Sequence, residues 1–97
     1  MMQPGIFTLD IGGKPIVTFE AKNLREAWEV CHERWLREDI ARLRSNGTSL
    51  WDGSATLRSR SASESERAVY REAAKAGEVP TDELVLAYLV ELDAESI

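Results

Sequence analysis

Arginine and tryptophan side chains in the middle of the chain have the chemistry best suited to binding. Arg42 and Arg44 precede Trp51, and Arg58 and Arg60 follow it. Guanidinium groups grip phosphates and carboxylates through paired hydrogen bonds, and an indole ring stacks on a base or anchors a protein contact. The region from Ile40 to Arg60 is also net basic. This combination predicts a binding surface for an acidic protein patch or for nucleic acid.

The sequence has few side chains suited to metal binding or acid–base catalysis. The single cysteine, Cys31, stands next to the single histidine, His32. Neighbouring helical side chains point about 100° apart, so these two do not converge on one ligand. A structural zinc site normally takes four ligands. We therefore expect Cys31 in the core and His32 at its boundary, with no metal, no cofactor and no catalytic residue.

Motifs for phosphate binding and for nucleophilic catalysis are absent from the sequence. The Gly12-Gly13-Lys14 run lies between two strand-like segments, whereas a P-loop is longer and opens into a helix. No Gly-x-Ser-x-Gly motif occurs, and Asp52-Gly53 is typical of a turn. An enzyme with an unrecognised site remains an alternative.

Charge is distributed unevenly along the 97 residues, although the whole chain carries a formal charge of −5. Six acidic residues and no basic one lie between Glu78 and Ile97, whereas the preceding residues are close to neutral. Such patterning bears on partners and solubility. The longest apolar run, from Leu84 to Val90, is too short to span a bilayer, which needs roughly 20 residues. We expect a cytoplasmic protein, since residues 1–5 resemble no secretory signal and one cysteine forms no internal disulfide.

The first elements are predicted by alternation and by capping residues. Residues 6–11 and 15–21 alternate around Gly12-Gly13 and predict a β-hairpin. A helix is predicted from Leu24 to about Arg44, with Asn23 and Glu26 as capping residues and Asn46-Gly47 after its last turn.

This predicted helix carries two apolar stripes. The first should face the sheet and contains Leu24, Ala27, Trp28, Cys31 and Trp35. The second lies about 100–150° further around and contains Leu36, Ile40 and Leu43. The second stripe needs a separate cover, either Leu50 and Trp51 of the same chain or a partner.

The remaining elements complete a βαβ series. Residues 56–61 predict a short strand, and a capping box of Ser63 and Glu66 begins a second helix that ends before Gly77. Residues 84–92 are apolar on both faces and predict an interior strand with cover on each side. The polar faces of the hairpin strands conflict with a sheet covered in this way. Either the loop of residues 46–55 covers the second sheet face, or another chain does.

These elements predict a single α+β domain spanning residues 1–97, with flexible ends at 1–5 and 94–97. Its order is ββαβαβ, with a mostly antiparallel or mixed four-stranded sheet and two helices on one face. The predicted function is association with a protein partner or with a second copy of the chain, without catalysis. The expected contact surface consists of Leu36, Arg37, Ile40, Leu43, Arg44, Trp51, Arg58 and Arg60.

Two other functions fit the charge pattern. One is a nucleic-acid-associated regulator that uses the basic segment Arg42–Arg60. The other is an acidic inhibitor that imitates nucleic acid with carboxylates such as Asp93 and Glu95. We expect no contact with a membrane.

Overall fold

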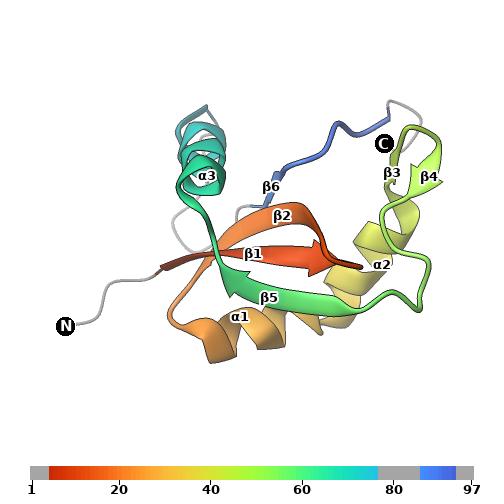
Figure 1. The fold of residues 1–97 in the computed structure, drawn as a ribbon, viewed down its shortest axis with the longest axis horizontal. Coiled ribbons are helices and arrows are strands. Elements are labelled where there is room, and N and C mark those ends of the chain that lie inside the picture. Colours follow the sequence, from red (N-terminus) through yellow and green to blue (C-terminus); the bar gives the residue numbers. More distant parts are fainter. Residues whose placement is uncertain (1–4, 77–85, 94–97) are drawn as a thin grey trace.

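A four-stranded antiparallel sheet organises the part of the chain that a computed structural model describes, residues 5–76 and 86–93 (Figure 1). Its strand order is β5-β1-β2-β6, from Leu57–Ser61, Gly5–Ile11, Lys14–Ala21 and Ala87–Tyr88 respectively. The predicted α+β class is therefore confirmed, and the sheet is antiparallel throughout. The expected flexible ends fall on residues 1–4 and 94–97, outside the described residues, except for Gly5, which begins β1.

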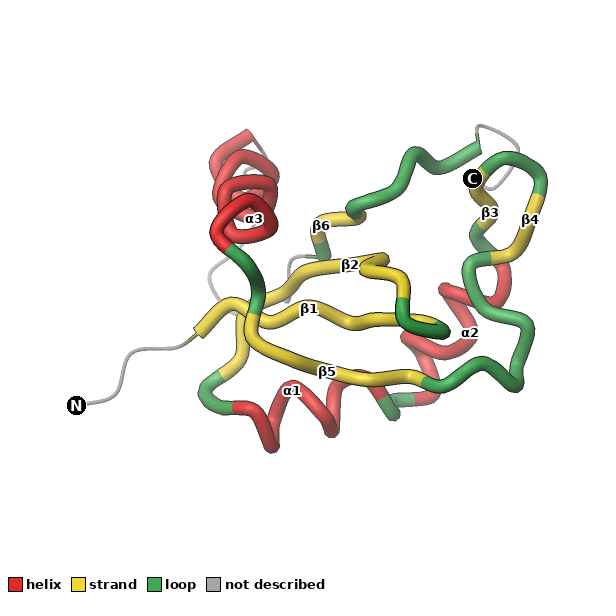
Figure 2. The backbone as a smooth tube through the Cα atoms, viewed as in Figure 1, coloured by secondary structure: helices red, strands yellow, loops and turns green. Residues whose placement is uncertain are grey.

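Three helices and a second, small hairpin complete the described elements. The helices are α1 at Leu24–Cys31, α2 at Arg34–Arg42 and α3 at Glu64–Ala76. The small hairpin pairs β3, Arg44–Ser45, with β4, Thr48–Ser49. Figure 2 shows this hairpin beyond the end of α2, away from the main sheet.

The predicted hairpin of β1 and β2 is confirmed. Gly12 and Gly13 have φ angles of 59° and 84°, and a tight turn with positive φ at both central residues matches the twist of the strands. Leu9 pairs with Val17, and the register shifts after Leu9, next to Ile16. Because of this irregularity, Ile16 joins the same core cluster as Leu9 and Val17.

The long predicted helix is two helices, so the prediction of one continuous helix was wrong. The His32 N–H donates to the Glu29 carbonyl and the Glu33 N–H donates to the Val30 carbonyl, which closes α1. Glu33 has an extended backbone with ψ of 138°. The break has a packing cause. The buried residues of α1 and those of α2 lie on different faces of a straight helix, so only a change of direction lets both face the sheet.

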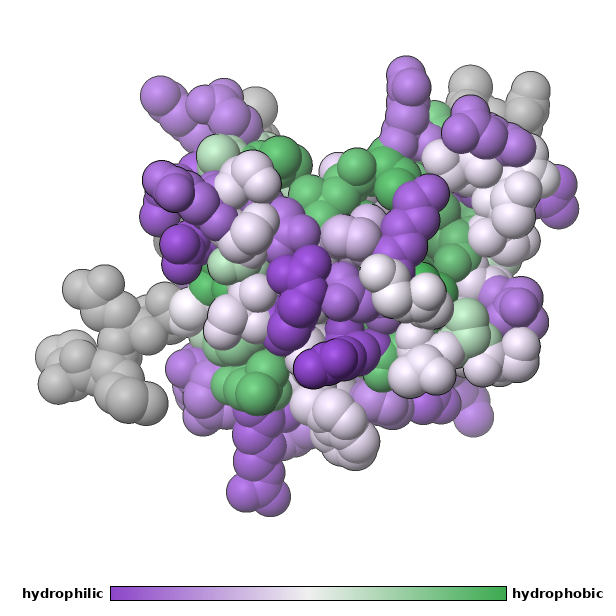
Figure 3. Space-filling model, in the orientation of Figure 1, coloured by the Kyte–Doolittle hydropathy of each residue, from purple (hydrophilic) through white to green (hydrophobic). Residues whose placement is uncertain are grey.

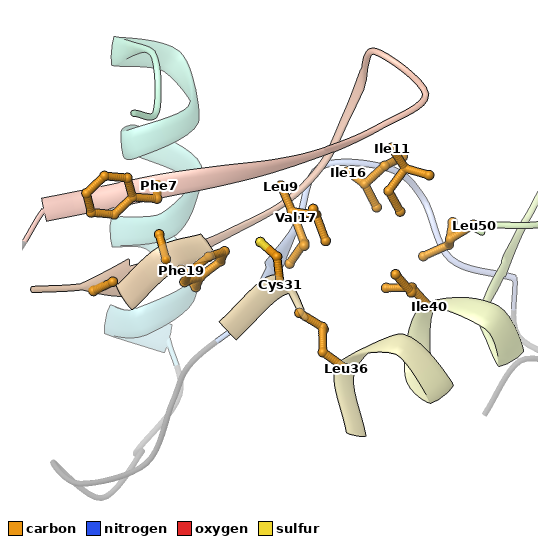
Figure 4. Packing of buried hydrophobic residues seen from close by; sticks show 12 residues of the cluster. Phe7, Leu9, Ile11, Ile16, Val17, Phe19, Cys31, Leu36, Ile40 and Leu50 are labelled. Atoms are coloured by element: carbon orange, nitrogen blue, oxygen red, sulfur yellow. The ribbon is translucent and has the colours of Figure 1, made fainter. Parts of the chain in front are cut away.

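The core lies between the sheet and the layer formed by α1 and α2. Figure 4 shows Cys31 beside Leu9 and Val17, with Leu36 and Ile40 below them. Leu50 from the segment after β4 packs at the end of this cluster, where Trp51 also contributes part of its ring. The 46–55 segment therefore extends the first core and does not cover the second sheet face.

The second sheet face is covered by α3, so the helices occupy both sides of the sheet, whereas the sequence led us to expect two helices on one side (Figure 1). Thr8, Asp10 and Thr18 point to this face and are buried. Glu66 in the first turn of α3 accepts hydrogen bonds from Thr8 and Arg60. Most of the polar side of the hairpin is thus hydrogen-bonded within one chain, whereas Asp10 Oδ1 is buried without a partner among the described residues.

The predicted interior strand at 84–92 is an edge strand of two residues, β6, paired with β2. Leu84 and Val85 lie outside the described residues. Beyond Tyr88 the chain leaves the sheet and runs to the β3–β4 hairpin (Figure 2). Its alternate apolar residues, Leu86, Tyr88, Val90 and Leu92, are partly buried against the core. The alternation reflects an extended segment with one buried side rather than a strand flanked by two others.

Asp93 fastens this extended segment to the small hairpin. Its carboxylate accepts the backbone N–H groups of Asn46 and Gly47 at 2.9 and 2.7 Å, and its own N–H donates to the Arg44 carbonyl. Asn46 and Gly47 have φ angles of 53° and 79°. These residues therefore form a hairpin turn, where we had predicted a helix cap.

Candidate functional site

Two of the eight residues predicted for the contact surface lie in the core. Leu36 and Ile40 are completely buried, and Leu43 is partly buried against the same cluster. In this structure these side chains stabilise the packing of α2 on the sheet. A contact surface would have to be formed by other residues of α2.

Arg60, from the predicted basic surface, belongs to an internal ion pair. Its guanidinium donates two hydrogen bonds of 2.9 Å to Glu66 and one of 2.9 Å to Asp10. These bonds with Arg60 lower the pKa of Glu66 to about 2, and further hydrogen bonds from Ser63 and Thr8 act in the same direction. The hydrogen bonds from Arg60 to Glu66 and Asp10 also raise the pKa of Arg60. The network joins β1, β5 and α3, so its first effect is on stability.

The other predicted arginines do not converge. Arg42 forms an exposed ion pair with Asp39 at 3.1 Å. Arg58 is exposed on β5, and Arg44 is exposed on β3, where its carbonyl accepts the Asp93 N–H group. The basic middle of the sequence is thus distributed over several elements rather than collected on one surface.

Arg37 and Trp51 are the two predicted residues that do come together. The guanidinium carbon of Arg37 lies 6.0 Å from the centre of the Trp51 ring, at the limit of a cation–π contact. The indole N–H of Trp51 donates to the Ala55 carbonyl at 2.8 Å, and Asp52 accepts the N–H groups of Ser54 and Ala55. This turn, which the Asp52-Gly53 sequence predicted, holds the Trp51 ring in place.

A surface pocket of about 330 Å³ opens beside this pair. Its lining comes from the end of α1, one side of α2 and the loop after β4: His32, Arg34, Arg37, Glu38, Ala41 and Trp51. Arg34 was not predicted for a site from the sequence, and His32 was expected only at the boundary of the core. The spacing of Arg34, Arg37, Glu38 and Ala41 could have indicated a shared helix side, but the approach of Trp51 depends on the tertiary fold.

The first predicted apolar stripe divides into a buried part and an exposed part. Ala27 and Cys31 are completely buried, whereas Leu24 is 53%, Trp28 54% and Trp35 43% exposed. The prediction that all five residues face the sheet was therefore wrong for these three. Trp28 also contacts the His32 ring, with centroids 4.2 Å apart. Leu24 and Trp28 on α1 and Trp35 on α2 therefore remain exposed.

Cys31 and His32 have the places expected of them. Burial raises the pKa of Cys31 to about 12, partly opposed by a hydrogen bond with Ser59, so the thiol stays protonated near neutral pH. The Nδ1 atom of His32 lies 2.8 Å from the Trp28 carbonyl. In the described part of the chain, no three His, Cys, Asp or Glu side chains are grouped to hold a metal ion.

An apolar hollow lies between α3 and the β3–β4 hairpin, on the face shown in Figure 3. Two smaller pockets of about 210 and 200 Å³ lie in this region. One includes Val69 and Leu89, and the other includes Ile11, Ile16 and Val90. The second of these carries one charged side chain, Lys14, and the first carries Glu66, which is already paired with Arg60.

Comparisons with known proteins give this chain no relative. No protein family, no curated protein and no solved structure matches it. Among residues 5–76 and 86–93, no helix has the length and apolar character needed to cross a bilayer. Functional inference therefore rests on the geometry of the described residues.

Proposed function

We propose that this protein is a non-catalytic cytoplasmic protein that works by association, and that two copies pair through the outer side of α1. The observation that carries the proposal is the exposure of Trp28, which is 54% exposed on a short helix whose Ala27 and Cys31 are completely buried. Tryptophan is among the residues most enriched at the centres of protein contacts. A half-exposed indole next to Leu24, one helical turn away, forms a ready-made anchor.

The apolar area available on this layer suits a dimer of ordinary size. At ~200 Å² for a large side chain, the exposed parts of Leu24, Trp28 and Trp35 amount to about 300 Å². A standard interface buries ~800 Å² on each partner, of which a little more than half is apolar. Leu24 and Trp28, one turn apart on α1, can therefore supply a large part of the apolar centre, with polar residues of α1 at the rim.

Charge along α1 favours a second copy as the partner. Arg25 and Glu29 form an exposed ion pair with 3.8 Å between Nε and Oε1. When two α1 helices pair antiparallel across a twofold axis near Trp28, Arg25 of each copy comes opposite Glu29 of the other. A twofold contact must be complementary to itself, and this arrangement of opposite charges around an apolar centre meets that condition.

The alternatives have less support from the same side chains. Nucleic-acid binding through Arg42–Arg60 is less favoured because two of its arginines already form ion pairs. Arg60 pairs with Asp10 and Glu66, and Arg42 pairs with Asp39. Nucleic-acid mimicry loses Asp93, whose carboxylate is occupied by the Asn46 and Gly47 N–H groups. Each alternative function therefore has fewer unpaired charged side chains available than the sequence indicated.

Sedimentation equilibrium over a wide range of concentrations tests the dimer. We expect the native chain to approach twice the monomer mass at micromolar concentrations and Trp28→Ala to remain monomeric with an unchanged circular dichroism spectrum. Val69→Ala is the matched control, because Val69 is a 40% exposed apolar residue on α3. A native chain that stays monomeric at every concentration would overturn the proposal.

A charge exchange tests the twofold geometry. Arg25→Glu and Glu29→Arg should each weaken association, because each places like charges opposite one another. The double variant R25E/E29R should recover it. Failure of recovery, with both single variants folded, would exclude this antiparallel pairing.

A further inference from the structure

The pocket beside Trp51 has an unusual balance of charge for a surface hollow. Arg34 and Arg37 line it, with Glu38 as the single acidic lining residue and Trp51 and Ala41 as its apolar part. A few convergent polar groups on an apolar wall are typical of small-molecule sites. His32 also lines the pocket, and its ring contacts Trp28, so the pocket adjoins the Leu24–Trp28 contact proposed above.

Arg37 supplies the strongest indication of a missing partner. Its Nε atom is buried, and no acceptor among the described residues bonds to it. A buried N–H group without an acceptor is destabilising, because its desolvation is not compensated. The guanidinium lies near the Trp51 ring and Arg37 lines the pocket, so an oxygen atom bound there can accept a hydrogen bond from the guanidinium.

The start of α2 adds a second cation, Arg34, at the same place. Its cap residue, Glu33, forms no side-chain hydrogen bond to the helix, and no acidic residue occupies the first turn. The first helical residue is instead Arg34. A helix N-terminus carries a partial positive charge, and a cation there is unfavourable unless an anion lies nearby. Arg34 and Arg37 together therefore favour a negatively charged ligand.

The size and walls of the pocket define the rest of the ligand. A volume of about 330 Å³ is at the lower end for small-molecule sites, so it accommodates one ring and its acidic group. Trp51 offers a flat apolar surface that is held in place by its hydrogen bond to Ala55. Guanidinium groups match the planar geometry of a carboxylate. We infer that the pocket binds a small organic anion, a flat ring that carries one carboxylate, with the carboxylate on Arg37 and Arg34 and the ring against Trp51.

Three simple probes separate the parts of this inference. Benzoate has both the ring and the carboxylate, acetate has only the carboxylate, and benzyl alcohol has only the ring. In a ¹H–¹⁵N correlation titration, benzoate should shift the Arg37 Nε–H and Trp51 indole signals, with saturation in the millimolar range. Acetate and benzyl alcohol should each bind at least about tenfold more weakly, because each makes only one of the two contacts.

Arg37→Gln should weaken benzoate binding at least about tenfold, since a charge-assisted hydrogen bond is lost. Arg71→Gln, an exposed arginine on α3, should leave binding unchanged. If Arg37→Gln does not fold, Arg34→Gln provides the same comparison. Benzoate shifts that never saturate, that spread evenly over surface amides, or that persist in the Arg37→Gln chain would overturn the inference.

Discussion

Arg60 holds Glu66 through two parallel hydrogen bonds, Nη1 to Oε1 and Nη2 to Oε2, each 2.9 Å long. Glu66 also accepts the Ser63 N–H group, so the residue that begins α3 through its capping box is the residue that ties α3 to β5. Helix initiation and the covering of the second sheet face therefore depend on one carboxylate.

The Arg60–Glu66 pair should make stability depend on acid pH. Glu66 has a pKa of about 2 in the folded chain and an ordinary value of 4.5 when unfolded, so the unfolded state takes up the proton first as pH falls. The contribution is complete above about pH 4.5 and is lost toward pH 2. Because Arg60 is partly exposed, we expect the Arg60–Glu66 pair to contribute ~2 kcal/mol to the free energy of unfolding. Urea unfolding at a series of pH values should show Glu66→Gln without this slope.

Glu72→Gln is the matched control for that measurement, because Glu72 is exposed on the same helix. It should retain the native pH dependence. Equal slopes for the native chain and Glu66→Gln would contradict the assigned role.

Cys31 should resist thiol reagents until the chain unfolds. Its burial and its pKa of about 12 leave almost no accessible thiolate at pH 8. Reaction with a disulfide reagent should be at least ~100-fold slower in buffer than in denaturant. A C31A/V69C chain, with its thiol on the exposed side of α3, should react rapidly in both. Fast native labelling of Cys31 would show that α1 does not cover it.

Leu36 and Trp35 are neighbours in sequence, yet their substitution by alanine should have different costs. Leu36→Ala removes a completely buried side chain and should lower the free energy of unfolding by about 3 kcal/mol. Trp35→Ala removes a side chain that is 43% exposed and leaves no enclosed cavity, so it should cost less than Leu36→Ala. Urea unfolding of both variants measures the difference, and equal losses would argue against the orientation of α2.

Asp93→Ala should loosen the turn at Asn46 and Gly47. It removes two charge-assisted hydrogen bonds that a carboxylate makes to backbone N–H groups. We expect hydrogen exchange at the Asn46 and Gly47 amides to accelerate at least about tenfold, with little effect on β1 and β2. Glu91→Ala, an exposed neighbour, should leave both rates unchanged. Unchanged exchange in Asp93→Ala would show that the hairpin holds its turn unaided.

Local features of this fold were predictable, since short-range chemistry determines them. The Gly12-Gly13 turn and the Ser63–Glu66 capping box depend on residues within a few positions of each other. The break at His32 was not predicted, because it arises from the different directions in which α1 and α2 must face the sheet. Its signal was present in the two stripes, which one straight helix could not bury together.

Long-range pairing limited the prediction of the last strand and of the sites. The alternation of residues 84–92 reports an extended chain with apolar sides, but it does not report which neighbours the chain meets. Likewise, Arg60 looked available until β5 placed it beside Asp10 and Glu66. Arg37 and Trp51 were both predicted for the surface, whereas their common pocket depends on how the loop after β4 returns to α2.

The hydrogen bonds between Asp93 and the β3–β4 hairpin have a consequence for synthesis on the ribosome. Residues 86–93 are made after every element they cover, so β1–β5 and the helices emerge while one side of the core is still open. Solvent then reaches the side chains of Ile11, Ile16 and Leu50 until Val90 and Leu92 leave the exit tunnel. The nascent chain can form the β1–β2 hairpin and the helices early, yet the open side of the core is covered only after Asp93 has been released.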